Sequence, residues 1–215
     1  MGWTFYNSSG EAMIQDGGLS IANNVNNYVV TATGVAGAAL NGESAMTYDG
    51  TTLTIPGQLA FPATQSASTG ANVLDDYEEG TWTPRFMDAD RDSDDQSVSY
   101  ATRVARYIKI GKMVWANFKL ELNNLGSLTT SDISYIGGLP FTAENTTNNN
   151  SGGLVFGAAS LAITAGYNIT LEVDYNTDFA YICLWDTSVG ITYMLISELS
   201  ADASIRGQLF YRAAA

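Results

Sequence analysis

From residue 97 onward, the sequence consists largely of runs in which every second residue is apolar. Side chains of a β-strand point alternately to its two faces, so such a run indicates a strand with one buried face. The clearest run has its apolar residues at Val114, Ala116, Phe118, Leu120 and Leu122. Further candidate strands cover residues 97–110, 154–164, 171–175, 178–186, 189–198 and 205–211, and no segment has the pattern of a long amphipathic helix. We therefore expect an all-β chain in which residues 81–215 form an antiparallel β-sandwich or jelly-roll knob.

The first 80 residues differ, because they are rich in Gly, Ala, Asn and Thr and hold only short candidate strands. Residues 46–55 predict a hairpin with an Asp49-Gly50 turn, flanked by short strands at 29–33 and 58–61. Strands this short, with small side chains, bury too little apolar surface to be stable in a single chain. They become stable when several chains share one narrow core, as in a trimeric β-prism. We therefore expect a homotrimer in which residues 1–40 are an extended segment and residues 41–80 form a stalk or neck of short β repeats.

The net charge of -13 limits the classes of partner. An acidic surface repels nucleic-acid phosphates and anionic lipid headgroups, so we expect neither nucleic-acid binding nor membrane insertion. The chain has no His and a single Cys, Cys183, which excludes Ser-His and Cys-His catalysis, an intrachain disulfide and a Cys-rich zinc site. Residues 1–84 contain no Lys or Arg, so we expect no secretory signal peptide.

Three motifs follow one another in the middle of the chain: LDDYEEGTWTP at residues 74–84, YIKIG at 107–111 and GLPF at 138–141. Two short repeats precede them, LNGES at residues 40–44 and YDGTTLTI at 48–55. In this order, the motifs resemble those of tail-fibre-like and virion surface proteins of tailed bacteriophages, many of them marine. In that family the YIKIG-like motif opens a strand.

The resemblance implies a homotrimeric, non-enzymatic protein of the virion surface, made in the bacterial cytoplasm, with a β-rich C-terminal module. We expect a short tail fibre or receptor-binding protein that attaches the phage to its host. The alternative is a trimer that decorates the capsid or forms a head fibre, and the absence of a long shaft before the first repeat favours it. The aromatic residues Trp3, Phe5 and Tyr6 are expected to anchor the N-terminal segment on another virion protein of the tail or capsid.

An acidic loop suggests one metal site. Carboxylates at Asp88, Asp90, Asp92 and Asp94 match alternate positions of a calcium-binding loop. The glycine and the terminal glutamate of that pattern are replaced by Ser93 and Ser99, so the competing interpretation is a solvated acidic loop without a cofactor.

Other polar and aromatic residues suggest carbohydrate contacts more than catalysis. The carboxylates of residues 75, 76, 78 and 79 are too close together in sequence to face each other across a sugar, so no glycosidase pair is expected. The loop around Asn145, Asn148, Asn149 and Asn150 offers amides that could contact glycan hydroxyls on the host surface. Trp115 and Trp185 lie inside strand patterns, which favours packing in the core or between subunits. The other aromatic candidates for stacking on sugars are Trp82, Tyr135, Tyr167 and Tyr193.

Overall fold

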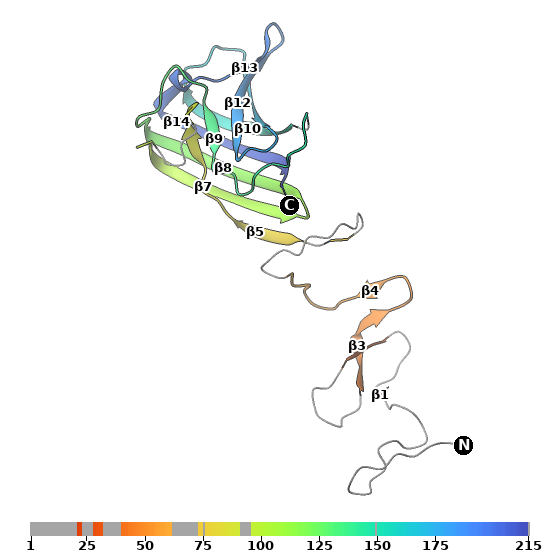
Figure 1. Cartoon of the computed structure of the whole chain (residues 1–215). Coiled ribbons are helices and arrows are strands. Elements are labelled where there is room, and N and C mark those ends of the chain that lie inside the picture. The colour runs from red at the N-terminus through yellow and green to blue at the C-terminus, as the bar shows by residue number, and fades with distance from the viewer. Residues whose placement is uncertain are drawn as a thin grey trace, which may run out of the picture. The chain divides into compact units, whose positions relative to one another are not determined.

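The computed structural model describes residues 21–22, 28–31, 40–61, 73–74, 76–90, 96–148 and 150–214. The chain divides into two compact units, residues 1–60 and 61–215, each of which is described by itself. Both units are built from β-strands, as the sequence predicts (Figure 1). Trp3, Phe5 and Tyr6 lie outside the described residues, so their role as an anchor stays a prediction, as does the functional division into anchor, stalk and knob.

The N-terminal unit is a small sheet centred on one strand. Strand β3 (Leu40–Tyr48) lies between β1 (Ile21–Ala22), which runs parallel to it, and the antiparallel β2 (Tyr28–Thr31). The predicted hairpin is confirmed, because β3 also pairs with β4 (Leu53–Thr54). Its turn is held by Asp49, whose carboxylate accepts hydrogen bonds from the backbone N–H groups of Thr51 at 2.9 Å and Thr52 at 2.7 Å.

The strand predicted at residues 58–61 is wrong. The structure has no strand there: Pro56 and Gly57 bend the chain away from β4, and no described strand of the unit pairs with the segment. Apolar side chains of the unit are correspondingly exposed: Tyr48 and Leu53 are each 51% exposed and Leu59 is 63% exposed. The short strands therefore leave their apolar side chains in solvent when the chain is taken alone.

The C-terminal unit contains one ten-stranded sheet whose paired strands are all antiparallel. The order across the sheet is β5-β7-β8-β14-β10-β11-β12-β9-β6, and β13 pairs with β12. The strands are β5 (Tyr77–Thr81), β6 (Arg85–Met87), β7 (Ser99–Ile110), β8 (Met113–Asn124), β9 (Tyr135–Gly137), β10 (Ser151–Leu161), β11 (Asn168–Val173), β12 (Phe179–Asp186), β13 (Gly190–Tyr193) and β14 (Leu199–Arg212). The strand predicted over 189–198 is only partly right, because a 3-10 turn, η1 (Ile196–Glu198), follows β13. None of the described residues forms a helix with the length and hydropathy needed to cross a membrane.

The sheet curls so that its two halves enclose one core. The strand β8 buries the alternating side chains that the sequence predicts, and Val114, Ala116 and Leu120 have no exposed surface. Residues of β11, β12, β9 and β6 join the same core cluster. The two ends of the sheet also approach each other, because the backbone N–H of Phe86 in β6 donates a hydrogen bond to the hydroxyl oxygen of Tyr100 in β7 at 3.0 Å. The layered arrangement predicted for this module therefore comes from one curled sheet instead of two separate sheets.

The three motifs meet in one cluster at the β5 edge. Strand β5 lies in the first motif and pairs with the end of β7, which carries the second motif. Asp76 and Lys109 form a buried ion pair, and the Lys109 ammonium lies 5.2 Å from the ring centre of Phe141 in the third motif. The ring of Tyr107 packs edge-on against the same Phe141 ring, with 5.2 Å between ring centres. We call these four residues and Gly80 the motif cluster.

Gly80 is fixed by this packing, because a Cβ atom there would lie 2.6 Å from the Tyr107 hydroxyl oxygen. The expected position of the second motif needs correction. Residues 107–110 end β7 instead of opening a strand, and Gly111, at φ +55°, turns the chain into β8. The glycine of the motif therefore serves the β7–β8 turn, where positive φ favours glycine.

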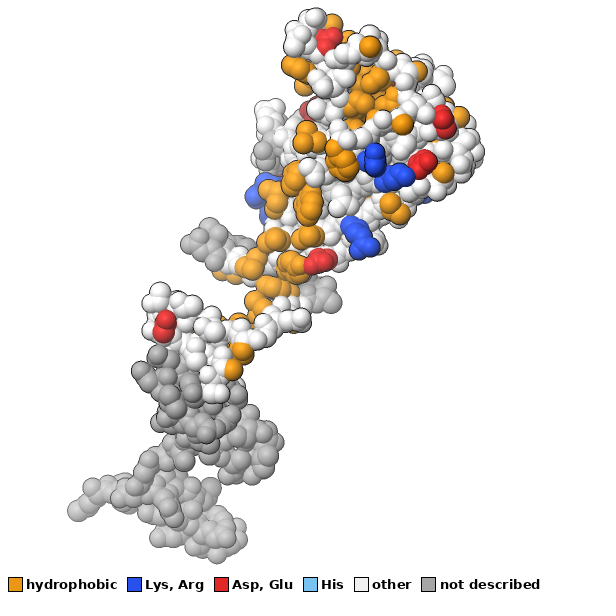
Figure 2. Space-filling view, turned by 180° about the vertical axis from the view of Figure 1, so that it is seen from behind, with side chains coloured by type: hydrophobic (Ala, Val, Ile, Leu, Met, Phe, Trp, Pro, Cys, Tyr) orange, Lys and Arg blue, Asp and Glu red, His pale blue; other side chains and the backbone are white. Residues whose placement is uncertain are grey.

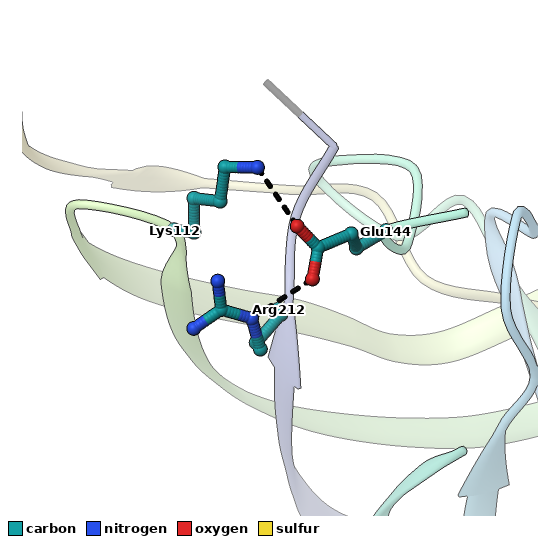
Figure 3. Close-up of polar contacts among 3 residues, drawn as sticks. All are labelled: Lys112, Glu144 and Arg212. Atoms are coloured by element: carbon teal, nitrogen blue, oxygen red, sulfur yellow. Dashed lines mark hydrogen bonds and ion pairs between the residues drawn. The ribbon is translucent and has the colours of Figure 1, made fainter. Parts of the chain in front are cut away.

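A second polar contact joins the loop after β9 to the central strand β14. Glu144 lies between Lys112 and Arg212 (Figure 3), with one carboxylate oxygen 2.8 Å from Lys112 Nζ and the other 2.9 Å from Arg212 Nε. The hydrogen bonds from Arg212 and Lys112 lower the pKa of Glu144 to about 2. The ionised carboxylate therefore holds the β7–β8 turn, the loop and the end of β14 together.

The buried ion pair gives a first prediction. Replacing Asp76→Asn or Lys109→Met should each lower the free energy of unfolding by about 3–5 kcal/mol, because each removes the opposite charge from beside a buried charged group. The double variant Asp76→Leu/Lys109→Met should recover most of that loss. Urea denaturation of the full chain measures the effect, and Lys112→Met, which breaks a partly exposed ion pair, is the control with an expected loss of about 1 kcal/mol or less. Equal losses in the control and in Lys109→Met would contradict the structural role of the pair.

The Glu144 carboxylate gives a second prediction, on pH. Its pKa is lower in the folded chain than the ordinary value of 4.5, so its contribution to stability is complete above that value and is lost as the pH falls towards 2. We expect Glu144→Gln to reduce the difference in urea midpoint between pH 6 and pH 2.5 relative to the unmodified chain. An unchanged pH profile in this variant would show that other carboxylates account for the acid sensitivity.

Candidate functional site

The outer face of the curled sheet carries large apolar side chains that the core does not use. Residues of β7, β8, β14 and β10 that alternate with the buried ones point outwards, and Val104, Trp115 and Phe156 are 58%, 40% and 65% exposed. Figure 2 shows hydrophobic side chains gathered in a stripe on the surface of this unit, with Lys and Arg side chains beside it. An apolar surface in the middle of a sheet marks a site of contact with a ligand or another protein.

A groove of about 650 Å³ lies on this outer face, and we call it the outer groove. Its volume falls within the range of typical small-molecule sites, and its mixture of aromatic and polar side chains is also typical of them. The lining residues come mainly from β7, β8, β14 and β10: Thr81, Trp82, Arg103, Val104, Ala105, Arg106, Trp115, Asn117, Phe118, Lys119, Phe156, Arg206 and Gln208.

A β-bulge places Phe156 at the groove. In the pairing of β10 with β14, Val155 lies opposite Gly207 and Gly157 lies opposite Arg206, so Phe156 is the extra residue between them. A bulge redirects side chains locally and is common beside functional sites. Gly157 also matters, because a Cβ atom there would lie 2.8 Å from Nη2 of Arg206. The absence of a side chain at Gly157 thus leaves room for the Arg206 guanidinium.

Trp115 forms part of the groove wall from the central strand β8. Its ring lies nearly parallel to that of Phe210, at 8° between planes and 6.3 Å between ring centres. The indole Nε1–H donates to the side-chain oxygen of Gln208 at 3.4 Å. These contacts fix the ring while leaving 40% of the residue's surface open to solvent. Trp115 therefore does not pack in the core of the single chain, because position 115 lies on the outward-facing side of β8. The other expected role, packing between subunits, stays a prediction.

The charged side chains that line the groove are all positive among the residues that the structure describes. Four of the nine Lys and Arg residues line it, and none of the described lining residues is Asp or Glu. Arg103 donates from Nε to the backbone oxygen of Pro84 at 2.6 Å, and Lys119 pairs with Glu121 at 2.7 Å. The side chains of Arg106 and Arg206 make no ion pair or hydrogen bond to any residue that the structure describes. Two guanidinium groups in the groove are thus available to a ligand from outside the described chain.

A smaller hollow of about 360 Å³ adjoins the outer groove along β5 and β7. The two hollows share Thr81, Arg106, Trp115 and Asn117. The smaller one adds a carboxylate, Glu79, which accepts a hydrogen bond from the Tyr77 hydroxyl. The combined surface therefore changes from cationic at Arg206 to mixed in charge at β5.

The other carboxylates of the first motif have partners within the fold. Glu78 accepts a hydrogen bond from the Tyr107 hydroxyl, and Asp76 is buried against Lys109. Burial, together with the neighbouring Glu78, raises the pKa of Tyr107 to about 12. Asp75 lies outside the described residues.

The predicted glycan loop lies elsewhere, between β9 and β10. Asn145, Asn148 and Asn150 are exposed there, while Asn149 lies outside the described residues. The Asn150 amide donates to Glu172 at 2.6 Å, and Asn148 has a φ of +60°, which suits an Asn in a turn. The structure places these amides apart from the outer groove lining, and their contact with glycan stays a prediction.

The predicted calcium ligands are only partly described, because Asp92 and Asp94 lie outside the described residues. Asp88 is fully buried and Asp90 is exposed. The Asp88 carboxylate accepts hydrogen bonds from Thr129 N at 2.8 Å, Gln96 Nε2 at 3.0 Å and Asp90 N at 3.2 Å. Burial alone would raise the pKa of Asp88, but these three donors together lower it. Among the described residues no group of three or more candidate ligands could hold a metal ion, so the calcium site stays a prediction.

The remaining aromatic candidates divide between core and surface. Trp82 is buried and packs edge-on against Phe118, with 5.9 Å between ring centres. Tyr135 is buried, and its ring centre lies 5.0 Å from that of Tyr181, which in turn contacts the half-exposed Tyr193. Trp185 is 41% exposed, so this residue also lies on the surface of the single chain.

The sequence analysis missed the cations of the outer groove. Each of these cations, Arg106, Lys119 and Arg206, occupies a polar position in a run of alternating residues. The alternation places each side chain on the outer face of its own strand, but only the strand pairing shows that the three lie on one shared surface. The pairing itself places Arg206 opposite Lys119 and Arg106 opposite Asn117. Without the order of the strands, the three residues appear as unrelated solvent-exposed charges.

No family model and no curated protein matches the chain. Among solved structures, the fold resembles part of the Dettilon tailspike protein, with a TM-score of 0.51 and 15% sequence identity. The match covers 63% of this chain and 24% of the tailspike chain, so the matched part of this chain corresponds to about a quarter of that protein. At this identity the likeness concerns the fold.

Asp88 gives a third prediction. Asp88→Asn should lower the free energy of unfolding by about 1–3 kcal/mol, because its new amide nitrogen cannot accept a hydrogen bond from the buried N–H donors. Asp90→Asn, at an exposed neighbouring position, is the matched control and should change stability little. Thermal melts with calcium and with a chelator complete the test. A calcium-dependent rise in melting temperature that both variants abolish would assign the loop to calcium, whereas a loss confined to Asp88→Asn at either calcium level supports the hydrogen-bonding role.

Proposed function

We propose that the chain is a non-enzymatic surface protein of a tailed bacteriophage virion and that it attaches the particle to its host, as a short tail fibre or receptor-binding protein. The observation that carries the proposal is the fold, an antiparallel β-module that resembles part of a phage tailspike. The motif cluster supports it independently, since the three motifs that resemble phage surface proteins pack against one another at one edge of the sheet.

The proposal includes a homotrimer. The N-terminal unit leaves Tyr48, Leu53 and Leu59 at least half exposed, although apolar side chains of this size are normally buried. Association of several copies along these strands would remove that surface from water. Trp3, Phe5 and Tyr6 complete the proposal as the contact with another virion protein of the tail or capsid.

The proposal assigns no catalytic reaction to the chain. Glycoside hydrolysis uses two carboxyl groups placed on either side of a sugar. Among the residues that the structure describes, the outer groove is lined by no carboxylate and the smaller hollow by one, Glu79. The proposal therefore concerns binding.

Attachment is tested with the purified full chain and with phage particles. We expect native mass measurement to give three times the chain mass, immunogold labelling to mark the tail, and added protein to reduce adsorption of the phage to its host. Denatured protein at the same concentration is the control. Labelling of the capsid together with unchanged adsorption would instead assign the chain to capsid decoration, and a stable folded monomer would contradict the trimer.

A further inference from the structure

We propose that the outer groove binds an acidic saccharide, a sugar chain whose residues carry carboxylate groups. The inference rests on the proposed function, because it names the class of host-surface molecule that the attachment protein contacts. It places the contact on the sheet face formed by β7, β8, β14 and β10 instead of on the Asn-rich loop after β9.

The charge of the groove selects an anion. The chain as a whole has a net charge of -13, yet the described residues that line the groove include four cationic side chains and no carboxylate. Lys119 is neutralised by Glu121 and Arg103 is held by Pro84 O, whereas Arg106 and Arg206 have no side-chain partner among the described residues. A guanidinium offers a planar pair of N–H donors that matches a carboxylate, and such charge-assisted bonds are stronger than neutral ones.

The remaining lining suits a sugar ring. Trp115 and Phe156 present apolar surface from two different strands, and saccharide rings have apolar C–H faces that pack on aromatic side chains. Asn117 and Gln208 add amides, which both donate to and accept from hydroxyl groups. Strand pairing sets Asn117 directly opposite Gln208, so these two amides lie on neighbouring strands of the groove floor.

The shape favours a chain of sugars over a single one. The smaller hollow continues the groove past Arg106 and Trp115 to Glu79. A carboxylate there repels an acid group and accepts hydrogen bonds from hydroxyls. We therefore place the acidic groups of the ligand near Arg106 and Arg206, and the hydroxyl-rich part of the ligand towards β5.

Two other occupants fit the observations less well. A nucleic acid would bring a dense row of phosphates against an acidic protein, which costs electrostatic energy beyond the groove. A second copy of the chain could cover Val104 and Phe156, but it would also have to supply carboxylates to Arg106 and Arg206. An acidic saccharide satisfies the arginines and the aromatic side chains at once.

The test uses polygalacturonate, a carboxylate-bearing sugar polymer, and its methyl ester, which has the same sugar backbone without the charge. We expect the full chain to bind immobilised polygalacturonate and to bind the methyl ester about tenfold or more weakly, as the loss of a charge-assisted hydrogen bond implies. Arg106→Gln and Arg206→Gln should each weaken binding to polygalacturonate about tenfold. Gly157→Ala should also weaken it, because the added Cβ displaces the Arg206 guanidinium.

The matched control is Arg212→Gln, which removes the same charge from the outer end of β14 but lies outside the groove lining. It should bind polygalacturonate as the unmodified chain does. Urea denaturation of every variant separates a loss of binding from a loss of folding. Trp115→Ala should abolish binding, whereas Trp115→Phe, which keeps an aromatic ring, should retain part of it.

The inference is overturned if the unmodified chain binds the acid and the ester equally, if it binds neither, or if Arg212→Gln weakens binding as much as the groove variants do. If Val104→Asp changes the oligomer mass and the unmodified chain does not bind polygalacturonate, this face of the sheet is a contact with a second copy of the chain. Adsorption assays separate this inference from the proposed function. If the unmodified protein and the double variant Arg106→Gln/Arg206→Gln block adsorption equally, the attachment function stands and the acidic ligand is wrong. If the protein binds polygalacturonate through these arginines but does not block adsorption, the acidic ligand stands and the attachment function is wrong.

Discussion

A sheet with one apolar face must remove that face from water, and the described residues of the C-terminal unit form a single sheet. Ten antiparallel strands therefore curl until the inner side chains of β8 and β14 meet those of β11 and β12 in a single core. The curl brings the two ends of the sheet together. The side chains that point outwards form a broad surface, and aromatic and cationic residues there do not disturb the packing of the core.

The motif cluster explains why residues distant in the sequence form one pattern. Three separate segments contribute Asp76, Lys109 and Phe141. The carboxylate of Asp76 pairs with the ammonium group of Lys109, and the ring of Phe141 lies beside that ammonium group. A buried ion pair of this kind does not tolerate the loss of one partner. Packing at the sheet edge therefore accounts for these motif residues, whereas Thr81 and Trp82 of the first motif line the outer groove.

The alternation of apolar residues predicts the long strands well, because burial of one face is a local property of the sequence. Val114 to Leu122 confirm this position by position. Residues 58–61 fail because a strand also needs a neighbour to pair with, which composition does not reveal. The sequence does not predict the groove for a related reason. Phe156 lies at the groove because of a β-bulge, and Arg106 and Arg206 line the same groove only because β7, β8 and β14 are neighbours in the sheet. Long-range pairing decides where such residues meet.

The position of β14 has a consequence for biosynthesis. This strand follows all the others in the sequence but lies in the middle of the sheet, between β8 and β10. Until the ribosome has released residues 199–212, β8 and β10 each have an unpaired edge, and the core between them stays open. The module therefore completes its fold only after translation has passed β14, and the nascent chain must be kept from pairing with its copies on the same polysome during that interval.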